Sequence, residues 1–377
     1  MQNLGIVLTG GGARASYQVG ALRALYEIIK PLGEGPVFDY LAGTSAGAIN
    51  TAYLAAFAND YDLATKELIR VWSNLSPEEV YKTNPLSLSK IGARWISGSV
   101  FGGLKKEGSS FNYLLDNGPL RNLLTKNIDM IKVRENIHQG TIKGMALTAT
   151  NYFSGASVIF YDSHKEVKPW YRSDRFGLRT TFGVDHILGS SAIPFFFPPT
   201  KIGESFYGDG CVRQTTPVSP CIHLGAQKII AVGIRHLRAQ ERTVELTMTP
   251  QDSTPGLAQI SGVTLNSVFL DSLESDVERM ERINQTLKKI PDHPELRSIP
   301  VLMLRPSQDL GLIAGQFVRD LPRTMRYLLK GIGASEEEGT DLISYLAFDR
   351  SFTSPLVDLG YHDTYRRKKE IEAFMEA

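Results

Sequence analysis

Cysteine and excess charge are both scarce in this 377-residue chain. Only Cys211 and Cys221 are present, too few for a disulfide framework and in keeping with a reducing compartment. The 41 basic and 40 acidic side chains leave a formal net charge of +1, which argues against nucleic acid as a partner. Histidine and cysteine do not cluster at the spacing of metal ligands, so we expect neither a metal nor another cofactor.

A secretory leader and a membrane-spanning helix are also not expected. The chain runs from Met1 into the apolar segment 4–8 with no cationic start and no cleavage site. Residues 40–59 carry no charge and have the length of a bilayer helix, but their glycines and hydroxyl side chains favour a buried strand followed by a buried helix. We therefore expect a cytoplasmic protein with at most peripheral contact with a membrane.

Apolar segments of strand length alternate with helical patterns along the chain. A hydrophobic content of 42% with 21% charged residues is typical of a folded globular protein. Strands alternating with helices imply a parallel sheet covered on both faces. The expected strands are 5–8, 38–42, 145–151, 157–161, 205–207, 229–234 and 301–304. We predict an α/β fold with three α/β/α layers and a central, mostly parallel sheet.

We divide the chain into a core over residues 1–250 and a helical extension over 251–377. The extension contains the strand 301–304, which we expect to pack on the core. A linker is predicted over 250–262, where Ser, Thr, Pro and Gly are frequent, and one long amphipathic helix over 266–289. The glycine-rich and aromatic stretch 91–111 is either a lid or a surface connection that packs its aromatic side chains.

The segment Gly43-Thr44-Ser45-Ala46-Gly47 fits the motif G-x-S-x-G. It follows an apolar strand and precedes a helix, the context in which a sharp turn exposes a serine hydroxyl at the carboxyl edge of a sheet. Small residues at Gly43 and Gly47 are what such a turn tolerates. Ser45 is therefore a candidate nucleophile.

Three successive glycines, Gly10, Gly11 and Gly12, follow the first strand. Backbone N–H groups in such a loop can surround a phosphate or the oxyanion of an acyl-transfer intermediate. A phosphate loop would need Gly-Lys-Ser/Thr, which is missing, and Ala15 breaks the pattern G-x-G-x-x-G. An oxyanion hole beside Ser45 is the better interpretation, and a tight structural turn is the alternative.

The serine also needs a base. The histidines that follow Ser45 in the sequence stand in no distinctive context, whereas Gly208-Asp209-Gly210 places one carboxylate on a turn after a short aromatic strand. By itself Gly-Asp-Gly is usually only a turn. Taken with Ser45, Asp209 is the preferred candidate.

Together the glycine triplet with Arg14, the Ser45 motif and Asp209-Gly210 resemble the patatin-like phospholipases, serine hydrolases that use a Ser–Asp dyad. Residues 189–199 also look like that family, and the resemblance is strongest over 4–60 and 185–215. It implies Ser45 as nucleophile, Asp209 as base, and the amides of the glycine triplet as the oxyanion hole. Arg14, Gly43, Gly47 and Gly210 are implied as supporting residues. Cys211 departs from the glycine or alanine common at its position.

The segment 193–199 holds three phenylalanines among three prolines. It is either an apolar wall for an acyl chain, a lip that touches lipid, or a loop that fills the core. The acyl-binding candidates are Pro194, Phe195, Phe196 and Phe197.

The resemblance implies hydrolysis of carboxylic esters in lipids, as in phospholipases A, lysophospholipases or carboxylesterases, with a phospholipid or other acyl ester as substrate and a transient contact with a membrane surface. An acyltransferase using the same dyad and a non-catalytic lipid-binding protein are the alternatives.

Overall fold

The computed structural model describes residues 3–376 except 34, 83–112, 238, 250–253, 291–295, 332 and 336–338. The predicted lid segment 91–111 lies outside the described residues. In the described part, one nine-stranded sheet is built from β1 (Leu4–Leu8), β2 (Tyr40–Thr44), β3 (Gly144–Asn151), β4 (Ser157–Ser163), β5 (Arg175–Arg179), β6 (Thr200–Ile202), β7 (Ser205–Asp209), β8 (Lys228–Val232) and β9 (Val301–Leu304).

Parallel strands form the centre of this sheet. Its main path runs β5-β4-β3-β2-β1-β8-β9, and the neighbours from β3 to β9 along this path all pair in parallel. The strands β4 and β7 both pair antiparallel to β3, and β6 pairs antiparallel to β7. The carboxyl ends of β1 and β2 therefore meet at one edge, beside the end of β7.

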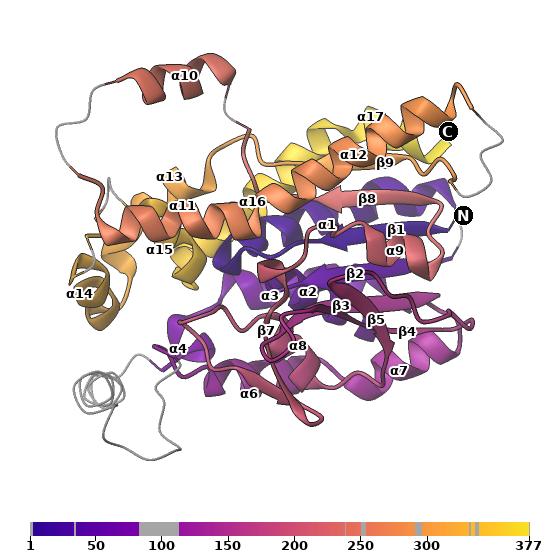
Figure 1. Cartoon of the computed structure of the whole chain (residues 1–377), viewed down its shortest axis with the longest axis horizontal. Helices are drawn as coiled ribbons and strands as arrows, with labels where there is room; N and C mark the ends of the chain where they lie inside the picture. Colours follow the sequence, from indigo (N-terminus) through magenta and orange to yellow (C-terminus); the bar gives the residue numbers. More distant parts are fainter. Residues whose placement is uncertain are drawn as a thin grey trace.

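Helices cover both faces of the sheet (Figure 1). Up to residue 224 they are α1 (Ser16–Ile29), α2 (Ala46–Ala56), α3 (Tyr61–Ser73), α4 (Pro77–Val80), α6 (Gly118–Asn127), α7 (Met130–His138), α8 (Val184–Ser190) and α9 (Ser219–Leu224). The later helices are α10 (Gln240–Met248), α11 (Leu257–Phe269), α12 (Asp271–Leu287), α13 (Leu310–Gly315), α14 (Arg323–Gly331), α15 (Thr340–Leu346), α16 (Arg350–Arg366) and α17 (Lys368–Glu376). The three-layer α/β/α fold with a helical C-terminal part is confirmed.

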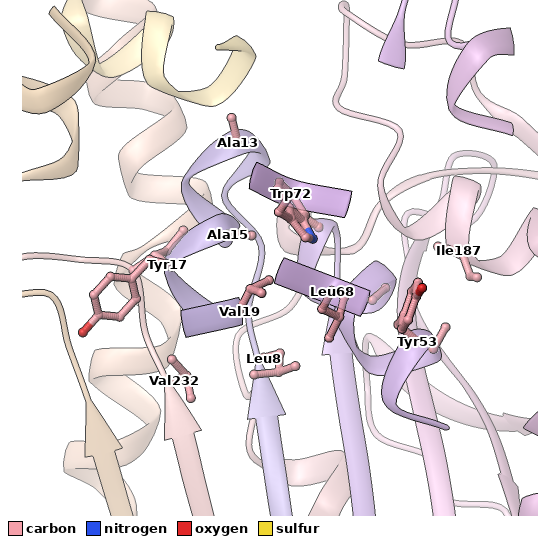
Figure 2. Packing of buried hydrophobic residues seen from close by; sticks show 14 of the residues in the cluster. Leu8, Ala13, Ala15, Tyr17, Val19, Tyr53, Leu68, Trp72, Ile187 and Val232 are labelled. Atoms are coloured by element: carbon pink, nitrogen blue, oxygen red, sulfur yellow. The ribbon is translucent and has the colours of Figure 1, made fainter. Parts of the chain in front are cut away.

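Two separate apolar cores explain the three layers. Alternate residues of a strand point to opposite faces, so Leu8 enters one core and Val7 the other. Figure 2 shows the first core, in which Leu8 and Val232 of the sheet face Val19 of α1, with α3 beyond. Each fully buried aliphatic side chain of this kind contributes about 1.5–3 kcal/mol to folding.

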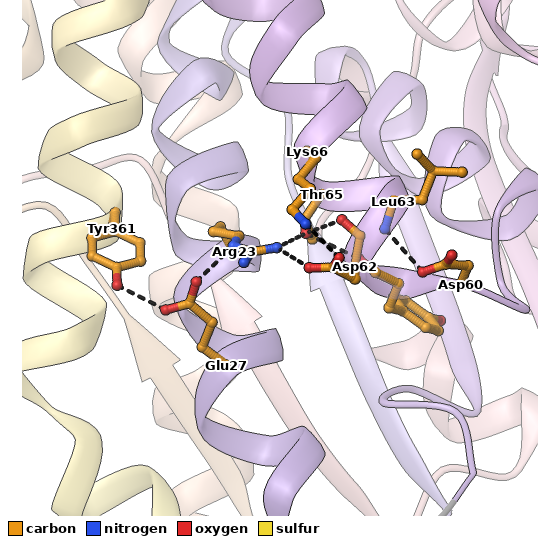
Figure 3. A network of polar contacts seen from close by, with 9 residues as sticks. Arg23, Glu27, Asp60, Asp62, Leu63, Thr65, Lys66 and Tyr361 are labelled. Atoms are coloured by element: carbon orange, nitrogen blue, oxygen red, sulfur yellow. Dashed lines mark hydrogen bonds and ion pairs between the residues drawn. The ribbon is translucent and has the colours of Figure 1, made fainter.

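The C-terminal helix α16 packs directly on α1. Glycines make this contact possible, because a Cβ at Gly20 would overlap the carbonyl of Val357 and a Cβ at Gly360 would overlap that of Tyr17. At the side of the contact, Arg23 of α1 donates to Glu27 at 2.7 Å and to Asp62 of α3 at 2.6 Å. Figure 3 shows that the hydroxyl of Tyr361 on α16 extends this polar network by donating to Glu27.

Two predictions about the segment 250–289 are wrong. Helix α11 begins at Leu257, inside the predicted linker, because Ala258 and Gly262 are buried, with Gly262 lying against Asp341 of α15. The predicted single helix 266–289 is divided between α11 and α12, which meet at Leu270. The division has a packing reason: Phe269 is buried in the first core and Leu273 in the second. Among the described helices, none is long and apolar enough to span a bilayer.

Candidate active site

Ser45 stands at the turn between β2 and α2 in an unusual backbone conformation. Its φ of 56° and ψ of −129° are strained for a residue with a side chain. The turn is tight on both sides: a Cβ at Gly43 would overlap Thr51, and a Cβ at Gly47 would overlap the carbonyl of Leu8. The predicted strand, turn and helix around Ser45 therefore fold as the glycine spacing indicates.

Asp209 ends β7 and reaches the serine. The hydroxyl of Ser45 donates to Oδ2 of Asp209 at 2.5 Å, across 164 positions of sequence. Antiparallel pairing of β7 with β3, with Asp209 opposite Ala149, sets this position. Ser45 is 1% exposed and Asp209 is fully buried. The two residues thus form a shielded, hydrogen-bonded pair.

A network of short hydrogen bonds fixes the orientation of both groups. Oδ1 of Asp209 accepts from the backbone amide of Cys211 at 2.9 Å, and its own amide donates to the carbonyl of Ala192. The amide of Ser45 donates to the hydroxyl of Ser190 at 3.0 Å, which in turn donates to the carbonyl of Thr148 at 2.6 Å. Sequence reasoning did not assign this role to Ser190, although it lies in the stretch 189–199 noted there.

Burial controls the acidity of the carboxylate. Removal from water disfavours the charged form, and it raises the pKa of Asp209 from its usual 3.8 to about 7. Hydrogen bonds from Ser45 and Cys211 oppose this rise. The phenol of Tyr152 lies nearby against Gly208, and its pKa is raised to about 12 by burial and by the charge of Asp209.

The glycine loop lies directly beside the pair. A Cβ built at Gly10 would be 2.5 Å from both Cys211 Sγ and Ser45 Cβ, so no side chain fits there. Gly12 has φ of 56° and would overlap the carbonyl of Tyr345 if it carried a Cβ. Among the described residues, no histidine is hydrogen-bonded to Ser45 or Asp209. The ring of His186 accepts a hydrogen bond from the backbone amide of Gly183, and the ring of His223 is stacked on Trp170. Within the part of the chain that the structure describes, a serine, a carboxylate and a backbone loop thus meet without an imidazole.

A profile of the family described as Patatin-like phospholipase matches residues 6–222, more than half of the chain. The chain belongs to the patatin-like phospholipase family. Membership supports lipid hydrolase activity. The matched segment contains the glycine loop, Ser45 and Asp209 and ends within α9.

Among curated proteins, no significant match to this patatin-like chain was found. Among solved structures, human GIVD cytosolic phospholipase A2 in complex with methyl gamma-linolenyl fluorophosphonate aligns with a TM-score of 0.44 at 11% identity, over 100% of this chain and 59% of that chain. VipD from Legionella pneumophila aligns with a TM-score of 0.31 at 12% identity, over 95% of this chain and 67% of that one. The family assignment rests on the matched segment and not on these distant neighbours.

Arg14 of the patatin-like segment points into the C-terminal helices. Its guanidinium forms an ion pair with Asp341 at 2.7 Å, donates to the hydroxyl of Ser344 at 2.6 Å and lies 4.4 Å from the ring centre of Tyr345. These partners occupy its polar face. Arg14 therefore joins the segment that follows the glycine loop to α15.

The four acyl-binding candidates of the patatin-like segment lie in different surroundings. Phe197 is 3% exposed and packs in the first core, 6.2 Å from the ring of Tyr81. Phe195 is 79% exposed and has φ of 68°, whereas Pro194 and Phe196 are half-buried. The segment therefore combines a residue that fills the core with one that faces solvent. A Cβ built at Gly210 would overlap the carbonyl of Thr148, so β3 and the turn after Asp209 are in close contact.

Proposed function

We propose that this protein hydrolyses fatty acyl esters of lipids through an acyl intermediate on Ser45, with Asp209 as the base. The 2.5 Å hydrogen bond between Ser45 Oγ and Asp209 Oδ2 supports the proposal most directly. A nucleophile within hydrogen-bond reach of its base is the arrangement that covalent ester hydrolysis requires. Family membership supplies the class of substrate.

In the first step, Asp209 accepts the proton of Ser45 as Oγ attacks the ester carbonyl. The amides of Gly10, Gly11 and Gly12 stabilise the oxyanion that forms, and each such donor is worth about 3 kcal/mol in the barrier. Collapse of the intermediate expels the alcohol, which takes the proton from Asp209. Water then attacks the acyl-serine, Asp209 accepts its proton, and the fatty acid leaves as Ser45 is reprotonated.

The pKa of about 7 suits Asp209 to this role. A general base works best when its pKa lies near the working pH, because enough of it is ionised and it still attracts a proton. A carboxylate at its usual pKa near 4 would be a weak base. Burial of Asp209 therefore supports a dyad that functions at neutral pH.

The test compares purified wild type with Ser45→Ala and Asp209→Asn on mixed phospholipids and neutral esters, with products identified by mass spectrometry. We expect both variants to lose about 10⁴-fold or more in turnover and to remain folded. A fluorophosphonate should label wild type at Ser45 and leave Ser45→Ala unlabelled. Turnover of Asp209→Asn near that of wild type would refute the dyad.

A second arm of the same experiment separates hydrolysis from acyl transfer. Glycerol or a lysolipid is added as a competing acceptor, and fatty acid is measured against the acylated acceptor. Fatty acid as the main product supports the hydrolase, and transfer to the acceptor as the main product supports the acyltransferase alternative.

A further inference from the structure

Helix α11 covers the glycine loop beside the dyad. Its last residue, Phe269, places ring atom Cδ1 3.2 Å from the Cβ position built at Gly10. The ring of Phe269 lies 5.2 Å from that of Tyr345, whose hydroxyl donates to Asn266 of α11 at 2.8 Å. The inner face of α11 is thus part of the wall around Ser45 and Asp209.

The outer face of the same helix exposes aliphatic side chains. Leu257, Ile260 and Val263 are 61%, 51% and 63% exposed, and their spacing of three residues places them on one side of the helix. No charged residue occurs from Thr254 to Leu270. A helix at a water-facing surface normally turns charged residues outward, whereas the exposed positions of α11 carry these aliphatic side chains and only the uncharged polar residues Gln259, Thr264 and Ser267.

A basic helix lies next to the start of α11. Helix α14 carries Arg323, Arg326 and Lys330 and no acidic residue, and Arg323 and Lys330 are exposed. Just beyond it, a Cβ at Gly333 would be 3.7 Å from Gly256, the residue before α11. Figure 1 shows α11, α13 and α14 at the same end of the molecule. Three glutamates follow in the sequence at 336–338.

We propose that the aliphatic face of Leu257, Ile260 and Val263, with the basic helix α14 beside it, docks on the surface of an anionic lipid bilayer. Aliphatic side chains enter the boundary between headgroups and acyl chains, and nearby Lys and Arg attract anionic headgroups. The proposal rests on the lipid hydrolase function, because a bilayer is where its ester substrates reside. It also gives α11 two tasks, one face toward the dyad and the other toward the lipid.

The choice of a bilayer over a protein partner follows from position. The face belongs to the same helix whose last residue, Phe269, contacts the glycine loop, so whatever binds it docks on an element that borders the dyad. A lipid surface docked there would lie against a helix that borders the site. A protein partner or a second copy of the chain would instead cover the approach.

The test measures sedimentation of the full chain with vesicles of phosphatidylcholine, with and without phosphatidylserine. Ser45→Ala is the background, so that no lipid is consumed and binding is scored independently of hydrolysis. Adding Ile260→Asp and Val263→Asp together should weaken binding about 10-fold or more, because two half-exposed aliphatic side chains no longer enter the lipid. Adding Arg323→Glu and Lys330→Glu should weaken binding mainly to vesicles that contain phosphatidylserine.

Ile131→Asp in the same background is the matched control. Ile131 is 70% exposed on α7, on a different part of the surface (Figure 1), and its replacement should leave binding unchanged. Circular dichroism and thermal unfolding verify that each variant is folded.

Three results would overturn the proposal. The first is that Ser45→Ala binds vesicles equally well with and without Ile260→Asp and Val263→Asp. The second is that Ile131→Asp weakens binding as much as these two substitutions do. The third is that light scattering finds Ser45→Ala as a dimer and the variant with Ile260→Asp and Val263→Asp as a monomer. Failure of the hydrolase proposal has a different signature. In that case wild type would bind vesicles in this way but release no fatty acid from them or from a soluble ester.

Discussion

The segment 6–222 and the segment 257–376 contribute to the same site in different ways. The first carries Ser45, Asp209 and the glycine loop in short motifs of small residues. The second carries Phe269, Tyr345 and Asp341 on helices of ordinary composition. The side chain of Phe269 lies against Gly10, the backbone of Tyr345 lies against Gly12, and the carboxylate of Asp341 pairs with Arg14. Each reacting group thus stands in a short local motif, whereas the enclosure of the site comes from helices later in the chain. Substitutions in the two segments should therefore change the reacting groups and their enclosure separately.

Apart from loss of Ser45 or Asp209 itself, the largest effect is expected within the first segment, from Gly10→Ala. The added methyl group would lie 2.5 Å from both Ser45 Cβ and Cys211 Sγ, so the loop must move away from the dyad. Displacing an oxyanion donor lowers kcat about 10²- to 10³-fold, which esterase assays with a soluble ester would measure. Gly331→Ala is the control, because no atom lies within 4 Å of its Cβ position. Full activity in Gly10→Ala would show that the loop is not an oxyanion hole.

An intermediate effect is expected where the two segments are joined, from Arg14→Met. The variant keeps much of the apolar volume but loses the bonds to Asp341 and Ser344 and the contact with Tyr345. Because Arg14 is 3% exposed while Asp341 stays partly hydrated, we expect the free energy of unfolding to fall by about 2 kcal/mol. Urea denaturation would measure this.

Arg70→Met is the matched comparison for Arg14→Met. Arg70 pairs with Glu67 on the surface of α3, where an exposed ion pair is worth only about 0.5 kcal/mol. Equal decreases in the free energy of unfolding of the two variants would mean that the contacts of Arg14 stabilise the protein no more than a surface ion pair does.

The smallest expected effect is a shift in the pH profile of kcat/KM. Asp209 must be ionised to act as a base, and burial raises its pKa to about 7, so kcat/KM should rise about tenfold per pH unit up to that value and then level off. Phe269→Ala removes part of the cover and admits water. Since burial is the main cause of the raised pKa, the bend in the profile should move to lower pH by about one unit.

The stability of the wild type should follow the same carboxylate. Its pKa is higher in the folded protein than in the unfolded chain, so the folded protein keeps the proton longer and stability falls as pH rises from about 4 to about 7. We expect the stability of Asp209→Asn not to fall in this way over the same pH range, because the asparagine does not titrate. Parallel pH dependence of unfolding in the two proteins would contradict a buried titrating carboxylate.

Much of the fold could be predicted because its signals are local. The apolar segments that became β1, β2, β3 and β9 are short, and the turn at Ser45 needs small neighbours that the sequence displays. The segment 250–289 was mispredicted because Ser, Thr and Gly there suggest a linker, whereas packing of Ala258 and Gly262 near α15 stabilises α11. The role of Ser190 was missed since nothing around a single serine indicates that its hydroxyl accepts from the amide of Ser45.

By itself the sequence determined the backbone turn at Ser45, the glycine loop and the order of the reacting residues, because each depends on side-chain size over a few positions. Only the tertiary structure decided that Ser45 and Asp209 meet, that Arg14 faces Asp341, that Phe197 is buried while Phe195 is exposed, and that α11 covers the loop. These depend on strand pairing and on helix packing between distant segments. Such contacts are selected by the total burial of the chain, which no local pattern encodes.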